Sequence, residues 1–547
     1  MTFRSIIPLF LFLSLLKTQP SPVNSNNPGN YYYRIFFTDK GDVSISDYLP
    51  EDLLSTDAIE RRARCGINSL SLSDLPVSSE YINSIKSKGL SFRCSSRWMN
   101  TALFSSSEAF NTSSIAGLSY VKKIELVKSP VKSGSPALDK FEKSGQPSDL
   151  DSFNPFNSVN GIPLMLSGYH GRGIKIAVLD VGFSYADKIG SLAALWSENR
   201  VIRTWDYVNN NSFVFDYHWH GTAVLSVLVG DPENSNPGPA SGAEFMLLRT
   251  EDGSSEYPVE EDYWVAAAEY ADSAGADIIT SSLGYCTFDN PVFNHSFSEA
   301  DGNTIFITRA ADIAAAKGIL VVNSAGNERQ KSWQRIIFPS DGDSVFCIGA
   351  TKQNLTIADF SSSGYSADRR VKPDVVAPGV DIPVQYQPSS WENVSGTSFS
   401  CPVISGMCAA LMQAVPDATA AEIREAVVKS ADRYNNPDSL YGYGLPDFTR
   451  ALKTLQDEYV QEHEAFIAAG PNPFSDKIDV VFNETPEHLF IEIIDQSGKI
   501  IRKINYSVYA SRLFTINSLD YLSQGVYFLR VRTSAGILTI KMIKLDQ

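Results

Sequence analysis

The sequence of 547 residues has few cysteines, no excess of positive charge and, after its N-terminus, no long apolar run. A net charge of −16 argues against a nucleic-acid partner, because binding to phosphates requires clustered Lys and Arg side chains. Six cysteines in a chain of this length do not make a disulfide scaffold. A transmembrane helix needs about 20 apolar residues, so we expect no transmembrane anchor.

The cysteines fall into three pairs with different expectations. Cys401 and Cys408 are predicted to share one helix, which places them about 10 Å apart, beyond the roughly 7 Å limit for a disulfide. We expect both to be small buried hydrophobic residues. Two other pairs could form disulfides, and the sequence leaves both open: Cys65 with Cys94, and Cys286 with Cys347.

One apolar run does occur, at the N-terminus. Arg4 precedes the run Ile6–Leu16, which ends at Lys17. This run is too short to span a bilayer and is typical of the apolar region of a secretory signal peptide. Residues 1–24 are therefore predicted to be a signal peptide and the protein to be exported. The alternative is a short buried strand or helix, which rarely begins so close to the start of a chain.

Composition divides the rest of the chain into four parts. Residues 30–128 mix strand-like and helix-like runs, which predicts a small α+β or α/β unit. Residues 129–152 are rich in Ser, Pro, Lys and Asp and are predicted to be an exposed linker, where proteolytic cleavage concentrates. Residues 468–547 contain short β-rich runs separated by turn signals at Gly498, Gly525 and Gly536, which predicts a small antiparallel β-sandwich.

Residues 153–465 have the pattern of an α/β domain. Four short apolar runs end in Gly or a polar residue, at 174–180, 276–284, 318–327 and 344–350. Continuous apolar runs are expected of parallel strands buried on both faces, and helical stretches lie between them. The prediction is a doubly wound, mostly parallel sheet, which places its site at the carboxyl ends of the strands.

Four short motifs lie at the ends of predicted strands or at the starts of predicted helices: Asp180-Val-Gly182, His220-Gly-Thr222, Ser324-Ala-Gly-Asn327 and Gly396-Thr-Ser398. A serine hydroxyl needs a base to take its proton, histidine suits this role near neutral pH, and a carboxylate must orient the histidine ring. We therefore predict Asp180, His220 and Ser398 as a catalytic triad. Asn327 is predicted to donate to the oxyanion. Pro402 is expected in the first turn of the helix after Ser398, where a missing N–H costs least.

The order Asp, His, Ser, with D-x-G, H-G-T-x-V, A-G-N and G-T-S-x-x-x-P, resembles the subtilisin-like proteases of peptidase family S8 over about residues 160–450. The segments Ser282-Leu-Gly284, K-P-D-V-V-A-P-G at 372–379 and Tyr441-Gly-Tyr-Gly444 match as well. The resemblance implies a secreted serine endopeptidase that works through an acyl-enzyme and needs no cofactor for the chemistry. It also implies that Ser282, Leu283 and Gly284 pair with the substrate backbone as an added strand.

Three other interpretations fit the sequence less well. An α/β-hydrolase requires G-x-S-x-G, but the segment at 396–400 lacks the final Gly, and His463 and His488 downstream are expected on the surface. A zinc site at His218 and His220 lacks a third ligand, so His218 is expected to be structural or adjacent to substrate. A non-catalytic binding protein with this fold would be expected to lack a member of the triad.

Acidic clusters raise the question of calcium, which many subtilases bind. The candidates are Glu260-Glu-Asp262 and the pair Glu299 and Asp301. Neither shows a recognisable ligand spacing, and runs of charge usually form a solvated face. No metal site is predicted, and structural calcium stays open.

The N-terminal unit resembles a propeptide of this family. The matching segments are Ala58-Ile-Glu-Arg-Arg62, Leu75-Pro-Val77 and Ser96-Arg-Trp-Met-Asn100. The resemblance implies a folding aid and inhibitor that is released by cleavage in the 129–152 linker. The alternative is a permanent structural domain.

The C-terminal unit resembles a type IX secretion sorting domain. The matching segments are Pro471-Asn-Pro-Phe474, Asp495-Gln-Ser-Gly-Lys499, Gly525-Val-Tyr-Phe-Leu529 and Lys541-Met-Ile-Lys544. The resemblance implies transport across the outer membrane of a gram-negative bacterium, followed by release or attachment at the cell surface. The expected partners are protein or peptide substrates, the chain's own propeptide and the type IX secretion machinery. The alternative is a β-domain that binds substrate or stabilises the protease.

Overall fold

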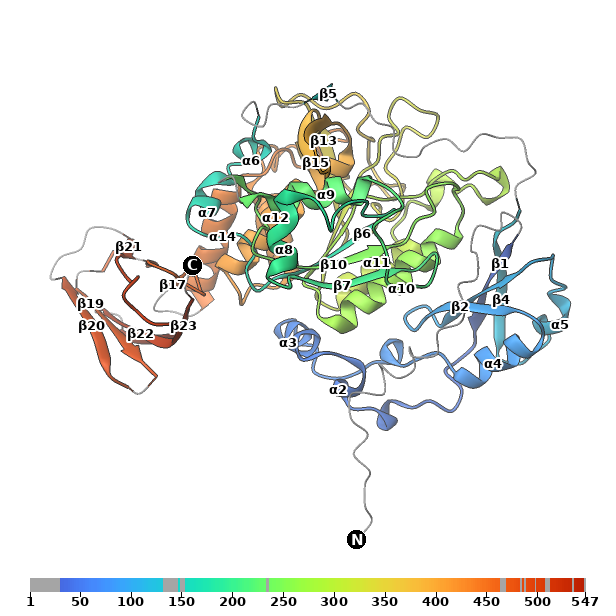
Figure 1. Ribbon diagram of the computed structural model, residues 1–547, viewed down its shortest axis with the longest axis horizontal. Coiled ribbons are helices and arrows are strands. Elements are labelled where there is room, and N and C mark those ends of the chain that lie inside the picture. The colour runs from blue at the N-terminus through green and yellow to red at the C-terminus, as the bar shows by residue number, and fades with distance from the viewer. Residues whose placement is uncertain are drawn as a thin grey trace, which may run out of the picture.

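The computed structural model describes residues 30–130, 146–147, 153–232, 236–462, 469–482, 485–486, 488–496, 498–506, 512–533 and 536–545. The predicted signal peptide and most of the predicted linker lie outside these residues. Within the described residues, none of the helices has the length and apolar character needed to cross a membrane. Figure 1 shows a central α/β unit with a smaller unit on each of two sides.

The centre of the molecule is a parallel sheet of seven strands in the order β14-β13-β12-β11-β6-β10-β7. The strands are β6 (Lys175–Asp180), β7 (Val201–Asp206), β10 (Glu244–Arg249), β11 (Ile278–Ser281), β12 (Leu320–Ser324), β13 (Phe346–Thr351) and β14 (Val375–Pro378). Each of the four predicted apolar runs contains one of these strands. The predicted doubly wound parallel sheet is confirmed.

Helices cover both faces of this sheet (Figure 1). One face packs against α9 (His220–Val229) and α12 (Thr397–Ala414), and the other against α10 (Val259–Ala274) and α11 (Phe306–Ala316). Successive residues of β6 show why its sequence is apolar throughout. Ile176 and Val178 belong to the first core and Ala177 and Leu179 to the second, because neighbouring side chains of a strand point to opposite faces. The helices α13 (Ala420–Ser430) and α14 (Phe448–Glu462) complete the first layer.

The N-terminal unit is an antiparallel sheet of four strands, in the order β2-β3-β1-β4, with short helices. Its elements are β1 (Tyr31–Phe37), α2 (Pro50–Leu53), α3 (Thr56–Arg64), α4 (Ser79–Ser87), β2 (Ser91–Ser96), β3 (Thr101–Ser106), α5 (Ser113–Ala116) and β4 (Val121–Lys128). This confirms the α+β prediction. The unit lies beside α10 and α11, the two helices that cover one face of the central sheet (Figure 1).

Buried polar contacts join the N-terminal unit to helix α10. The carboxylate of Glu269 accepts hydrogen bonds from the backbone N–H groups of Arg97, at 2.9 Å, and Trp98, at 3.0 Å. Arg34 pairs with Asp262 at 2.7 Å, and its guanidinium lies 3.6 Å from the ring centroid of Phe306. Because these groups lie in the interface, the two units are held by charge as well as by apolar contact.

The C-terminal unit is built from two antiparallel sheets, β17-β18-β21 and β20-β19-β22-β23. Its strands are β17 (Ala469–Gly470), β18 (Ile478–Val481), β19 (Leu489–Asp495), β20 (Ile500–Tyr506), β21 (Leu513–Ile516), β22 (Gly525–Thr533) and β23 (Gly536–Lys544). Side chains of both sheets share one core, which includes Ile478, Ile491 and Leu529. The predicted β-sandwich is confirmed, although Gly525 and Gly536 begin strands instead of lying in turns.

All six cysteines lie in the described part of the chain, and all six are free. Cys401 and Cys408 are buried on α12, as predicted. The two pairings that the sequence left open are not formed.

The remaining short elements are η1 (Ile45–Asp47), η2 (Leu72–Asp74), β5 (Gln146–Pro147), α6 (Pro155–Ser158), α7 (Ile162–Leu166), η3 (Gly190–Leu192), α8 (Ala193–Ser197), β8 (Gly230–Asp231), β9 (Asn236–Pro237), η5 (Pro291–Phe293), η6 (Phe297–Glu299), β15 (Ile382–Gln387) and β16 (Ser390–Val394).

Candidate active site

Asp180 and His220 meet at the carboxyl end of β6. Asp180 is the last residue of this strand and is fully buried, and its Oδ1 accepts a hydrogen bond from the N–H of Val181 at 2.8 Å. Nδ1 of His220, the first residue of α9, lies 2.9 Å from Oδ1 and 3.1 Å from Oδ2 of Asp180. A carboxylate can only accept, so this contact places a proton on Nδ1 and leaves Nε2 as the basic nitrogen of a neutral ring.

Two glycines allow the Asp180 and His220 segments to approach so closely. The N–H of Gly221 donates to the carbonyl oxygen of Gly182 at 3.1 Å. A Cβ added to Gly221 would lie 2.5 Å from that oxygen and 2.9 Å from Cβ of Asp180. A Cβ added to Gly182 would lie 2.8 Å from the backbone N of His218. A larger residue at position 182 or 221 would therefore push the two segments apart, which explains the glycines in D-x-G and H-G-T.

Ser398 is the second residue of α12 and is 8% exposed. Its hydroxyl donates to the carbonyl oxygen of Ser282 at 3.4 Å, and the hydroxyl of Ser282 donates back to the carbonyl oxygen of Ser398 at 2.8 Å. The next residue, Phe399, has its ring centroid 5.7 Å from that of His220. Ser398 thus lies at the N-terminus of α12, between the end of β11 and the start of α9.

The position of Pro402 in α12 differs from the prediction. The helix begins at Thr397, so Pro402 is its sixth residue and lies beyond the first turn. In a regular helix the carbonyl oxygen of Ser398 would accept from the N–H of residue 402, which proline lacks. The hydroxyl of Ser282 occupies that acceptor instead, so the missing helical hydrogen bond leaves no buried carbonyl oxygen unpaired.

Asn327 follows β12 and lies beside the start of α12. Its Oδ1 accepts hydrogen bonds from the N–H and the hydroxyl of Thr397, both at 3.0 Å. Gly326 has a φ of +97°, and an added Cβ there would lie 2.9 Å from the side chain of Ile337. Glycine is therefore required before Asn327 for both its backbone angle and its lack of a side chain.

The segment Ser282–Gly284 continues β11 beyond the last residue that pairs in the sheet, Ser281. The carbonyl oxygen of Leu283 accepts from Nδ2 of Asn323 at 3.0 Å, and a Cβ added to Gly284 would lie 2.3 Å from Ile337. The structure therefore holds this segment next to Ser398. All seven residues predicted for the site lie in the described part of the chain.

Comparison with known proteins identifies the family. The family model described as "Subtilase family" matches residues 171–444, which is half of the chain. The chain belongs to the subtilase family. Two further models match its flanks: "Peptidase S8 propeptide domain, Bacteroidota" over residues 32–143 and "Secretion system C-terminal sorting domain" over residues 470–545. This subtilase therefore carries a propeptide domain and a sorting domain for secretion or the cell surface.

Curated relatives support the assignment as a serine endopeptidase. Subtilisin DY of Bacillus licheniformis is 29% identical over 296 residues, which cover 52% of this chain and 95% of the relative. The thermophilic serine proteinase of Bacillus sp. (strain AK1) is 28% identical over 274 residues, covering 50% of this chain and 60% of the relative. Thermitase of Thermoactinomyces vulgaris is 27% identical over 290 residues, covering 52% of this chain and 90% of the relative.

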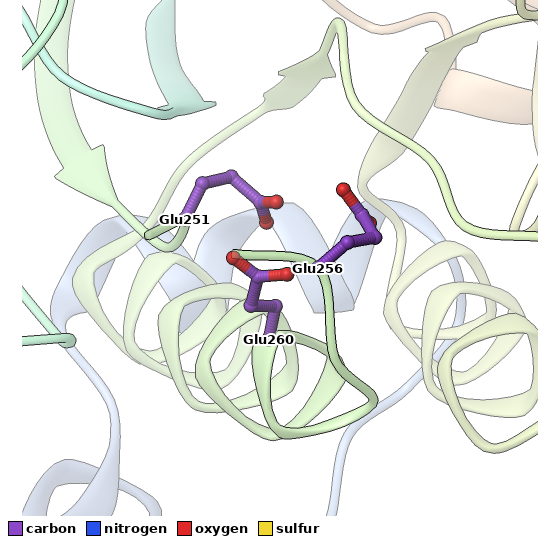
Figure 2. Close-up of side chains that lie close together, drawn as sticks. All are labelled: Glu251, Glu256 and Glu260. Atoms are coloured by element: carbon purple, nitrogen blue, oxygen red, sulfur yellow. The ribbon is translucent and has the colours of Figure 1, made fainter. Parts of the chain in front are cut away.

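Three glutamates converge beside the loop between β10 and α10 in this subtilase (Figure 2). Carboxylate oxygens of Glu251, Glu256 and Glu260 all lie within 4.8 Å of one another. Both oxygens of Glu260 accept backbone N–H groups, and Glu251 accepts from the hydroxyl of Tyr285. Calcium takes six to eight oxygen ligands, so these three carboxylates would supply only part of a calcium site. The prediction singled out Glu260 but missed the other two.

The other acidic candidates are occupied by protein donors. Glu261 lies 2.7 Å from Nε2 of His295, and Asp262 pairs with Arg34. Glu299 accepts from the backbone N–H of Ser296 at 2.7 Å, as in a helix cap. Asp301 accepts from the backbone N–H groups of Asn303 and Thr304 at 2.9 and 2.8 Å. These acids stabilise local turns or the domain interface.

His218 lies beside the predicted triad, and His488 lies away from it. Nδ1 of His218 accepts a hydrogen bond from the backbone N–H of His220 at 3.2 Å, so His218 helps to position the start of α9. His488 is exposed next to β19, in agreement with the prediction of a surface residue, and His463 lies outside the described residues.

Proposed function

We propose that this subtilase is made as an inactive zymogen and that its mature form hydrolyses peptide bonds on Ser398. The observation that carries the proposal is the contact between Nδ1 of His220 and buried Asp180 at 2.9 Å, at the carboxyl edge of the sheet, where Ser398 lies in the first turn of α12. Asp180 orients the ring and stabilises the imidazolium that forms when Nε2 takes a proton.

The reaction proceeds in two halves. His220 takes the proton of Ser398 Oγ as this oxygen bonds to the scissile carbonyl carbon, and then gives the proton to the leaving amine as the C–N bond breaks. In the second half, water attacks the acyl carbon while His220 takes one of its protons. The bond from this carbon to Ser398 Oγ then breaks as His220 returns the proton to Oγ, which releases the acid. Asn327 Nδ2 and the N–H of Ser398 donate to the oxyanion in both tetrahedral intermediates.

The proposed division of the chain follows from the same proposal. Residues 1–24 are the signal peptide, 30–128 the propeptide, 129–152 the linker in which cleavage occurs, 153–465 the catalytic domain and 468–547 the sorting domain. The segment Ser282–Gly284 binds the substrate backbone as an added strand. The partners are protein or peptide substrates, the chain's own propeptide and the type IX secretion machinery.

A quenched peptide library tests the proposal, with the full chain purified and its propeptide shown to be removed by mass spectrometry. We expect cleavage by the wild type and a loss of several orders of magnitude in kcat for Ser398→Ala. A fluorophosphonate probe, which forms a covalent bond with an activated serine, is expected to label the wild type at Ser398 only. Absence of both cleavage and labelling after removal of the propeptide would instead support a binding protein.

A further inference from the structure

The side chain of Lys128 is bound by a loop of the catalytic domain. Lys128 is the last residue of β4 and directly precedes the proposed cleavage linker. Its ammonium donates to the hydroxyl of Ser255 at 3.0 Å, lies 3.5 Å from Oδ2 of Asp252 and lies 5.4 Å from the ring centroid of Tyr257. A hydroxyl, a carboxylate and an aromatic face are the partners that an alkylammonium prefers. The loop at 250–257 therefore forms a seat for a basic side chain.

This loop is connected to the proposed catalytic residues. At its start, the N–H of Thr250 donates to the carbonyl oxygen of Asp180 at 3.0 Å. In its middle, a Cβ added to Gly253 would lie 3.9 Å from the ring of His218. At its end, Glu256 donates its N–H to Asp289 at 3.1 Å and accepts the N–H of Asp289 at 3.1 Å. The loop therefore spans from the Asp180 side of the site to the chain that follows the substrate-binding strand.

The propeptide approaches this loop as an extended chain. Val127 is buried in a cluster with Tyr257 and Tyr263 of the catalytic domain, so its neighbour Lys128 reaches the seat from a strand. Cleavage in the linker makes residues 128 and earlier the upstream side of the cleaved chain. Lys128 thus occupies a position that an upstream side chain of another extended substrate would reach.

The charge of the loop suits a cation after the propeptide has left. Residues 250–262 contain six acidic residues and no Lys or Arg. The carboxylates of Glu251, Glu256 and Glu260 converge next to the same loop (Figure 2). Burial raises the pKa of Asp252. The charge of Lys128 and the hydrogen bonds from Ser254 together lower this pKa by more than burial raises it, so it lies below the ordinary value. Removal of Lys128 leaves this negative potential without its ammonium partner.

We propose that Asp252, Ser255 and Tyr257 form a specificity-determining subsite that takes a Lys or Arg side chain upstream of the scissile bond. Lys128 occupies this subsite in the zymogen. The inference rests on the proposed function and names the substrate class, which is polypeptide with a basic residue on the upstream side. Because the side chains of Lys128 and Asp252 are 19% and 30% exposed, we expect a preference of about tenfold, which corresponds to one charge-assisted hydrogen bond.

The test uses the mature enzyme from the full chain and matched peptides that carry Lys or Gln at each upstream position in turn. At one position we expect the wild type to show a kcat/KM about tenfold higher for Lys, mostly through KM, and a smaller preference at high salt. Asp252→Asn is expected to reduce the preference to threefold or less. Glu425→Gln, which removes the same charge from exposed α13, is expected to retain it.

The outcomes separate the two proposals. A wild type that cleaves peptides without a basic preference, or an Asp252→Asn variant that keeps the full preference, would overturn the subsite and leave the protease proposal intact. A wild type that cleaves no peptide would contradict the proposed function itself. In the full chain, Lys128→Gln is expected to speed release of the cleaved propeptide. Combining it with Asp252→Asn is expected to change the release rate little further, because each substitution removes the same contact. Additive effects of the two substitutions would contradict the proposed binding of Lys128 by Asp252.

Discussion

At Asn327 the two polar atoms of one side chain have separate roles. Oδ1 accepts both hydrogen bonds from Thr397, which fixes the amide plane and leaves the N–H2 group as the donor of the side chain. A donor that is fixed before the reaction stabilises the oxyanion without reorganisation, so its effect is on the transition state.

We therefore predict that Asn327→Ala lowers kcat by about 10²–10³-fold with little change in KM. Steady-state kinetics on one quenched peptide measures both constants. Thr397→Ser keeps the hydroxyl that holds Oδ1 and is expected to retain most of the activity, whereas Thr397→Val is expected to lower kcat. A change confined to KM in Asn327→Ala would show that the side chain binds substrate instead of the oxyanion.

At the scale of elements, buried Asp341 joins the connection between β12 and β13 to the start of α11. Its Oδ1 accepts from the hydroxyl of Thr308 at 2.7 Å and its Oδ2 from the N–H of Gly302 at 3.0 Å. Burial raises its pKa to about 6, more than these hydrogen bonds and the charges of Lys372 and Arg370 lower it.

This pKa predicts a pH-dependent stability. An aspartate with a raised pKa in the folded state stabilises the fold below its unfolded pKa of about 4, and this contribution is lost as pH rises through about 6. The loss amounts to about 3 kcal/mol. Both proteins for the test carry Ser398→Ala, and one of them also carries Asp341→Asn. As pH rises from about 4 to about 6, we expect the melting temperature of the protein that keeps Asp341 to fall by several degrees relative to that of the Asp341→Asn protein. Calorimetry at successive pH values measures the difference, and parallel profiles of the two proteins would contradict it.

The same scale shows which strands sequence reasoning finds. The runs that contain β6, β11, β12 and β13 are apolar throughout because these strands are interior and are covered on both faces. Strand β7 was not predicted, because it lies at the sheet edge, contains Arg203, and has five of its six residues at least partly exposed. The interior strand β10 has only four consecutive apolar residues between Glu244 and Arg249, which is too short a run to stand out.

The residues of the candidate site and its surroundings fall into two groups: those that stand in a local motif and those that only the fold brings together. Asp180, His220, Asn327 and Ser398 stand in local motifs, so the sequence alone singles them out as candidates. The convergence of carboxylates at the loop 250–257 was not predictable, because the proximity of Glu251 and Glu256 depends on how the chain folds back. Contacts with the distant Tyr285 and Asp289 hold it in place, and no local pattern encodes them.

At the scale of the whole molecule, the propeptide contacts the catalytic domain along α10 and the loop before it, and two of these contacts lie at opposite ends of this stretch. One is the contact of Lys128 with Asp252 and Ser255 in the loop before α10. The other is the C-terminal end of α10, where Asp272 is fully buried and receives Arg61 at 2.5 Å and Arg62 at 2.6 Å from α3. Arg62 also pairs with Asp74 at 2.9 Å. Cleavage in the linker leaves this second contact unchanged, so cleavage alone does not release the propeptide.

We therefore predict that the cleaved propeptide co-elutes with the catalytic domain in size-exclusion chromatography of the wild type, and that Asp272→Ala releases it. The variant leaves two buried arginines short of their counter-ion in the complex, whereas both are solvated after dissociation. Removal of one partner from a buried pair costs about 3–5 kcal/mol, which is on the order of 10²–10³-fold in affinity.

Arg64→Ala provides the matched control on α3, the helix that carries Arg61 and Arg62. Arg64 pairs with Asp277 at 3.2 Å, but its side chain is 39% exposed, and such surface pairs contribute about 0–1 kcal/mol. This variant is expected to keep the propeptide bound. If Asp272→Ala also keeps it bound, with an unchanged melting temperature of the mature domain, the remaining interface contacts, among them those of Arg34 and Glu269, are enough to retain the propeptide. If both variants release it, total charge at the interface matters more than burial of the Asp272 pair.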